Sequence, residues 1–109
     1  MEHDKYEISF QIISLAGSAR CDASEAIDCA KIQKYDEAFA HIRQAKNFLS
    51  QAHHLQTAMI TNEARGQAVD INIIVIHSQD HLIMAMMAVD NAEELIEIYS
   101  EMQKIRKDL

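Results

Sequence analysis

The stretch YEISFQIISLAGSARCDASEAIDCAK, residues 6–31, decides the fold. Its apolar positions recur at intervals of four and three, which is the period of an amphipathic α-helix. These positions are Ile8, Ile12, Ala16, Ala19, Ala23, Ala26 and Ala30. We therefore expect a helix over residues 5–32, with this face turned toward the core.

The same spacing continues in the next segment, after the polar residues 33–36. The apolar positions there are Ala38, Ile42, Ala45, Leu49, Ala52 and Met59, with Gln56 in the same column. Asp36 is a suitable N-cap, and Gly66 suits the left-handed position just beyond a helix end. A second helix is therefore expected over residues 36–65, antiparallel to the first.

A third helix is expected over residues 71–105, after an acidic cap at Asp70. Its core column is predicted to be Ile74, Ser78, His81, Ala85, Ala88, Ala92, Leu95 and Tyr99. The run at 71–76 is rich in β-branched residues, so a strand over residues 70–76 stays the alternative. The simplest closed arrangement of three such helices is an all-α, antiparallel three-helix bundle, here a single domain over residues 1–109.

Composition excludes several other classes of protein. The 109 residues contain no proline and two glycines, too few for a turn-rich β-sandwich or barrel. The net charge of −7 and the scattered basic residues argue against a nucleic-acid partner. The densest apolar stretch, residues 71–89, is interrupted by polar side chains, so no membrane insertion is expected. The N-terminus does not resemble a secretion signal, and we expect a cytoplasmic protein.

The two cysteines, Cys21 and Cys29, lie eight residues apart in the first expected helix. That spacing separates them by about 12 Å, whereas a disulfide needs Cα atoms within about 7 Å. They are therefore expected to be reduced, half-buried thiols.

The third expected helix carries a second stripe in addition to its core column. It contains Ile73, His77, Asp80, Met84 and Met87, again at helical spacing. Such a patch is typical of an interface, so we expect self-association through this helix. In a cyclic assembly the copies of Asp80 would face one another, and their carboxylates would repel unless a cation or a proton intervened.

Polar groups of this helix are concentrated at His77, Asp80 and His81, which are neighbours on one side of it. An imidazole there can act as base, metal ligand or nucleophile, or it can be a satisfied structural histidine. Spacing alone leaves these readings open.

Four segments of the chain resemble the lactose/cellobiose-type enzyme IIA proteins of the bacterial sugar phosphotransferase system, and they occur in the same order along the chain as in that family. The segment IIVIHSQDHL at residues 73–82 resembles the family's histidine motif. The others are AGSAR at 16–20, AHHLQT at 52–57 and EARG at 63–66. Together the four segments extend over nearly the whole chain.

The resemblance implies a phosphoryl carrier that is a homotrimer of three-helix subunits. His77 would accept a phosphoryl group from the histidine-containing phosphocarrier protein and pass it to a cysteine of enzyme IIB, during uptake of a β-disaccharide such as cellobiose, lactose or chitobiose. Asp80 would meet its copies at the trimer axis around a divalent cation, with magnesium expected.

Two segments depart from the family, which usually has Ala at Ser78 and a Gly-Asp turn at residues 33–36. Neither change removes a group that the transfer requires. Gln79 and His81 are secondary candidates that could donate to the phosphoryl group or orient His77. Gln56 needs a buried partner.

The remaining histidines carry less information. One of His53 and His54 is expected to face inward and the other, most simply His54, outward. His3 and His41 carry no signal.

Two other functions compete with the phosphoryl carrier. The first is a metal-binding helical bundle that uses His77, Asp80 and His81, because histidines at positions i and i+4 can bind zinc. The second is a purely structural trimeric helical module, in which the stripe is only an interface.

Overall fold

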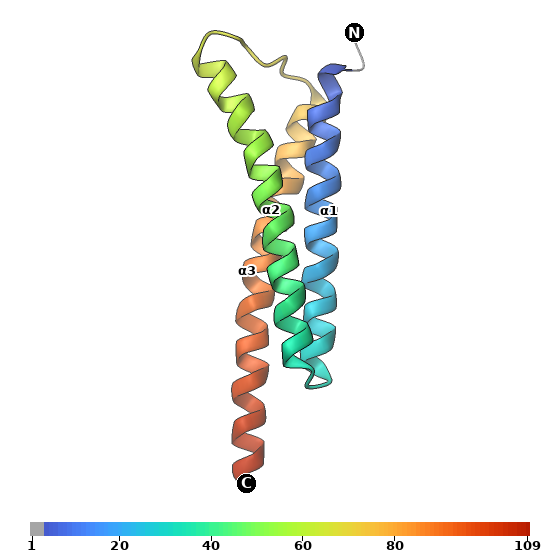
Figure 1. Cartoon of the computed structure of the whole chain (residues 1–109), viewed down its shortest axis with the longest axis vertical. Helices are drawn as coiled ribbons and strands as arrows, with labels where there is room; N and C mark the ends of the chain where they lie inside the picture. Colours follow the sequence, from blue (N-terminus) through green and yellow to red (C-terminus); the bar gives the residue numbers. More distant parts are fainter. Residues whose placement is uncertain (1–3) are drawn as a thin grey trace.

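The computed structural model describes residues 4–109, which form three helices (Figure 1): α1 (Asp4–Lys31), α2 (Tyr35–Ala64) and α3 (Ile73–Asp108). α1 and α2 are antiparallel and joined by a tight turn, and α3 runs back beside them. None of the described residues forms a strand. The prediction of an all-α three-helix bundle is confirmed, and the alternative strand over 70–76 is wrong.

The core is built mainly from alanines. The predicted face of α1 is buried from Ile12 to Ala30, whereas Ile8 is 39% exposed. On α2 the predicted column is buried from Ala38 to Ala52. Because alanine carries only a methyl group, the backbones of the two helices can approach closely along this column.

The core column predicted for α3 is confirmed only in part. Ser78, Ala85 and Ala92 are buried as expected, but the other core positions are Val75, Leu82, Val89 and Ile96. The predicted residues between them, Ile74, His81, Ala88, Leu95 and Tyr99, are all half-buried or exposed. Both columns have intervals of three and four, so spacing alone could not show which of the two is buried. The observed column is filled by branched side chains packed against α1 and α2.

The predicted N-caps, Asp36 and Asp70, are both wrong. The N-cap of α2 is Lys34, without a side-chain hydrogen bond, and Asp36 lies in the first turn, where the helix dipole favours a negative charge. The N-cap of α3 is Asn72, whose side chain accepts a hydrogen bond from the Val75 amide at 3.0 Å. Gly66 does follow the end of α2 with φ of +85°, as predicted.

The two ends of the bundle differ in how closely α2 packs. Its buried residues stop at Ala52, and its last turns diverge from the other two helices (Figure 1). We call residues 16–31, 35–52 and 82–99 the closed half, and residues 53–81 the open half. In the closed half the Tyr35 hydroxyl donates to the Tyr99 carbonyl at 3.2 Å, and Lys46 pairs with Glu93 at 2.8 Å.

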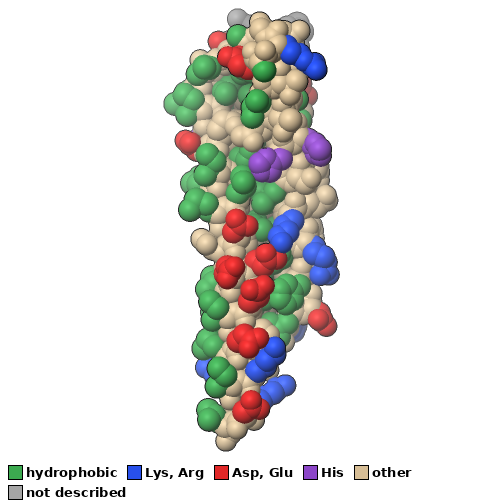
Figure 2. Space-filling model, turned by 90° about the vertical axis from the view of Figure 1, so that its left-hand side faces the viewer, with side chains coloured by type: hydrophobic (Ala, Val, Ile, Leu, Met, Phe, Trp, Pro, Cys, Tyr) green, Lys and Arg blue, Asp and Glu red, His purple; other side chains and the backbone are tan. Residues whose placement is uncertain are grey.

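α3 is the one helix of the described chain that is long and apolar enough to cross a membrane by length and composition. One of its faces packs in the core, and a second apolar face is exposed. The exposed stripe consists of Ile73, Ile76, Met84, Met87, Leu95, Ile98, Met102 and Ile105. Figure 2 shows hydrophobic side chains along one edge of the molecule, beside acidic side chains in its lower half. An acidic flank of this kind favours a protein interface over lipid.

Candidate functional site

His77 lies on the second turn of α3 and is exposed. Its Nε2 atom is 3.0 Å from Nε2 of His81, one turn further along the helix. The ring centroids are 4.3 Å apart, and the planes meet at 84°, edge to face. A hydrogen bond between these two nitrogens requires that one ring donates and the other presents its lone pair. The contact therefore makes one ring of the pair the donor and the other the acceptor.

A chain of hydrogen bonds anchors the helix turn that carries His77. Gln56 of α2 donates through Nε2 to Oε1 of Gln79 at 2.6 Å. Gln79 in turn donates to the Ser78 hydroxyl at 3.2 Å, and Ser78 donates to the Val75 carbonyl at 2.6 Å. The partner that Gln56 was expected to need is thus Gln79, across the gap between α2 and α3.

Ser78, the position at which the sequence departs from the resembled family, takes part in this chain and is fully buried. Sequence reasoning treated it as a small change beside His77. Nothing in the helical spacing could show that its hydroxyl accepts from Gln79, because that contact depends on the rotamers of both side chains.

Asp80 is exposed on α3, and its carboxylate forms no hydrogen bond or ion pair with the other described side chains. It lies in the exposed apolar stripe, with Ile76 on one side along the helix and Met84 on the other. These two side chains are 46% and 45% exposed in the single chain. An unpaired carboxylate within an apolar stripe needs a partner from outside the subunit if the stripe becomes buried.

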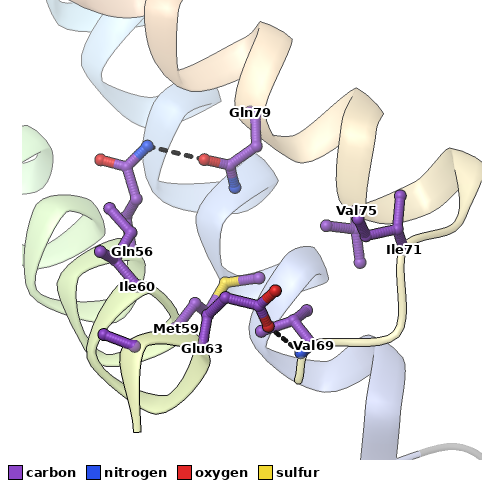
Figure 3. Close-up of a pocket in the computed structure, with 9 residues that line it drawn as sticks. Gln56, Met59, Ile60, Glu63, Val69, Ile71, Val75 and Gln79 are labelled. Carbon is purple, nitrogen blue, oxygen red and sulfur yellow. Dashed lines mark hydrogen bonds between the residues drawn. The ribbon is translucent and has the colours of Figure 1, made fainter. Parts of the chain in front are cut away.

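A cavity of about 420 Å³ adjoins this site in the open half (Figure 3). Its lining is mainly apolar and includes Met59, Ile60, Val69, Ile71 and Val75. The Gln56–Gln79 hydrogen bond lies at one side of the cavity, and at the other Glu63 accepts from the Val69 amide at 2.8 Å. The two bonds hold the last turns of α2 to α3 and to the linker, although apolar packing between them is incomplete.

Two of the three histidines of α2, taken as a pair, are not placed as expected. Both His53 and His54 are exposed, so the prediction that one faces inward is wrong. The core positions on either side are Ala52 and the half-buried Leu55, and both histidines fall on the outer arc between them. His3 lies outside the described residues.

The cysteines are both free, in agreement with the sequence analysis. Cys29 is half-buried as expected, whereas Cys21 is exposed. Cys21 follows Arg20 on the outer surface of α1, away from the alanine column.

Comparison with known proteins identifies the class of protein. A family model described as "PTS system, Lactose/Cellobiose specific IIA subunit" matches residues 7–100. The lichenan-specific phosphotransferase enzyme IIA component of Bacillus subtilis is 41% identical over 106 residues, which cover 97% of this chain and 96% of that protein.

Solved structures agree with this result. The PTS cellobiose-specific enzyme IIA from Bacillus anthracis has a TM-score of 0.88 at 40% identity, with 90% of each chain covered. The IIA(Chitobiose) protein in complex with HPr, from the Escherichia coli phosphotransferase system, has a TM-score of 0.80 at 29% identity, covering 91% of this chain and 96% of that one.

The chain therefore belongs to the lactose/cellobiose-specific IIA subunits of the phosphotransferase system. It is a sugar-specific phosphoryl carrier, as the sequence analysis predicted.

Proposed function

We propose that His77 is the residue that carries the phosphoryl group, received from the histidine-containing phosphocarrier protein and passed to a cysteine of enzyme IIB. The observation that carries this proposal is the exposed His77 ring, held against His81 within the segment that resembles the family's histidine motif. The solved complex of a related IIA protein with HPr supports the choice of donor.

In the proposed transfer, a lone pair on the His77 ring attacks phosphorus in line with the donor. A new P–N bond forms to His77 while the P–N bond of the donor phosphohistidine breaks, and the electron pair stays with the donor imidazole. In the next step the IIB thiolate attacks, a P–S bond forms and the P–N bond to His77 breaks. Such a transfer needs positioning and neutralisation of charge more than covalent help from the protein.

His81 has a defined role in this scheme. Its Nε2 contact at 3.0 Å holds the His77 ring in one orientation before the transfer. When His81 carries the proton, its N–H leaves the His77 lone pair as that pair attacks phosphorus, and it can then donate to a phosphoryl oxygen, since a charged acceptor makes the stronger hydrogen bond. Gln79 is held by Gln56 and supports the helix turn, not the phosphoryl group directly.

The apolar side chains around His77 limit attack by water on the phosphorylated ring. Replacement of Ile73 or Met84 with serine is therefore expected to speed hydrolysis of the phosphorylated protein. The measurement is the decay of the phosphorylated species by intact mass, with Ile105→Ser, at an exposed position further along the same stripe, as control. An unchanged decay rate in both site variants would contradict the proposal that these side chains limit attack by water.

We place the subunit in a homotrimer assembled through the exposed stripe of α3. In that assembly three copies of Asp80 approach the axis. Their carboxylates offer only oxygen ligands and find no partner within the described subunit, which fits magnesium, a cation that prefers oxygen. Asp80 would hold the cation, whose chemistry is to neutralise the three carboxylates inside the interface.

The proposed sugar is a β-linked disaccharide such as cellobiose, lactose or chitobiose, and the proposed location is the cytoplasm. Relatives named for lichenan, cellobiose and chitobiose support this class of sugar. The carrier histidine does not contact the sugar in this scheme, so its residues do not distinguish among these disaccharides.

The test is phosphoryl transfer from phosphoenolpyruvate through the general phosphotransferase proteins, read by intact mass. We expect one acid-labile phosphoryl group on the native protein, none on His77→Ala, and one on the control His54→Ala, which changes an exposed histidine of α2. A folded native protein that takes up no phosphoryl group would contradict the proposal.

A metal-binding bundle remains the alternative, because the Nε2 atoms of His77 and His81 lie 3.0 Å apart. Zinc bound tightly and stoichiometrically by the native protein and lost in both His77→Ala and His81→Ala would favour it, provided that no phosphoryl group is taken up.

A further inference from the structure

A second cluster of ligand-bearing side chains lies on the seam between α1 and α2 and involves no residue of α3. It consists of Asp22, Glu25 and His41, each of which offers one ligand atom within 4.8 Å of the other two. Asp22 is buried with 8% of its surface exposed, His41 is half-buried and Glu25 is exposed. His41 carries no signal in the sequence, because its partners come from another helix.

Both nitrogens of the His41 ring face carboxylates. Nδ1 lies 2.9 Å from Asp22 Oδ1, a hydrogen-bond distance, and Nε2 lies 3.5 Å from Glu25 Oε2. A neutral imidazole has a single N–H, so it can donate to only one of the two carboxylates. The other nitrogen then turns its lone pair toward a negative oxygen. A metal cation between them, like a second proton on the ring, converts this repulsion into attraction.

The longer of the two distances suits such a cation. Zinc binds imidazole nitrogen and carboxylate oxygen at about 2.0–2.2 Å in tetrahedral geometry, which separates two such ligands by about 3.3–3.5 Å. The 3.5 Å between His41 Nε2 and Glu25 Oε2 agrees with that separation. The shorter contact, to Asp22, is the carboxylate–imidazole hydrogen bond that orients histidines in metal sites.

The thiol of Cys21 lies beside Glu25. Cys21, one turn before Glu25 on α1, has its Sγ atom 4.0 Å from Glu25 Oε1. Glu25 thus has one carboxylate oxygen toward His41 and the other toward Cys21. Cys21 is exposed and free, so its thiol is accessible to a metal ion. The Cys21 thiol is not one of the three groups whose ligand atoms lie within 4.8 Å of one another, so it reaches the ion only after a rotation of its side chain. Sulfur, nitrogen and oxygen ligands together are typical of zinc sites.

We infer that this seam binds one zinc ion through His41 Nε2, the Glu25 carboxylate and the Cys21 thiolate, with Asp22 holding the imidazole in place. Binding releases the thiol proton to solvent. The fourth position is left to water. The ion would clamp α1 to α2 in the closed half and would take no part in phosphoryl transfer, so this inference does not rest on the proposed function.

The test is a titration of the reduced full-length protein with zinc chloride, followed by calorimetry and by the thermal unfolding midpoint. We expect one zinc ion per chain that raises the midpoint. Loss of a partner that only orients a ligand weakens metal sites by about 10–100-fold, so His41→Ala should weaken binding by at least about tenfold. Glu25→Gln, at an exposed position, provides a second variant should His41→Ala fold poorly.

Matched controls separate this site from the histidine pair of α3. His54→Ala and His77→Ala should both retain the zinc ion of the seam. With cobalt in place of zinc, a thiolate-to-cobalt charge-transfer band should appear and be lost in Cys21→Ser. Absence of zinc binding, binding unchanged in both His41→Ala and Glu25→Gln, or binding lost only in His77→Ala would overturn the inference. A cobalt complex without the band would overturn the assignment of Cys21.

Discussion

The closed and open halves of this bundle use the same helices but pack them differently. In the closed half, alanines such as Ala26 and Ala45 are fully buried, and α1 and α2 lie close together. In the open half, α2 has no buried residue after Ala52, and a cavity of about 420 Å³ separates its last turns from the linker and the start of α3. The residues that we propose for phosphoryl transfer lie in the open half.

This difference shows how one small domain divides its tasks. The closed half supplies stability through small side chains and close contact between helices. The open half replaces packing with a few directional hydrogen bonds, from Gln56 to Gln79 and from the Val69 amide to Glu63. Regions with few buried apolar contacts open more readily, which suits a surface that is proposed to receive two partners in turn.

The largest contrast is expected from truncation of core side chains. Ile96→Ala, in the closed half and fully buried, should lower the free energy of unfolding by about 2–5 kcal/mol. Met59→Ala, on the cavity wall, should cost clearly less, because its side chain is already half-exposed. Urea denaturation at one fixed protein concentration compares the two. Equal losses would contradict the division into halves.

A smaller contrast is expected from enlargement of side chains. Ala26→Leu forces a branched side chain into a fully buried position and should cost about 1–3 kcal/mol or more. Val69→Leu extends into the cavity and should change stability by less than about 0.5 kcal/mol. The check is the unfolding midpoint of both variants under the same conditions, and a similar loss for both would show that the cavity is not available for extra volume.

The hydrogen bond between Gln56 and Gln79 is expected to contribute about 1 kcal/mol, the usual net value for such a bond. A double-mutant cycle with Gln56→Leu and Gln79→Leu measures the coupling between the two side chains. Strict additivity would mean that the bond does not hold α2 to α3. Phosphoryl uptake by the same variants reports whether the anchored turn matters for transfer.

The smallest effect is expected in the turn between α1 and α2. Gln33 adopts φ of +66°, in the left-handed region that suits glycine, at a place where the resembled family usually has a Gly-Asp turn. Gln33→Gly should therefore raise the free energy of unfolding by about 0.5–1 kcal/mol, less what is lost when Gln103 no longer donates to the Gln33 side chain. Gln103→Ala isolates that loss, and a destabilised Gln33→Gly in a Gln103→Ala background would contradict the argument.

Helical spacing was sufficient for the three helices and for the core of α1. There the predicted column is buried from Ile12 to Ala30, although Ile8 is exposed and Ser9 is buried beside it. On α3 the spacing was insufficient, since the columns beginning at Ile74 and Val75 have the same intervals. Only packing against two other helices distinguished them, and it buried the column with Leu82 and Ile96.

The sequence by itself determined the helical architecture and the family, because both depend on the order and period of residues along one chain. It also placed His77, Asp80 and His81 together, since they are neighbours on a single helix. Tertiary structure alone decided the contacts between helices: Gln56 with Gln79, the cavity behind them, and His41 between Asp22 and Glu25. Such contacts depend on the rotation and separation of whole helices, which no local spacing encodes.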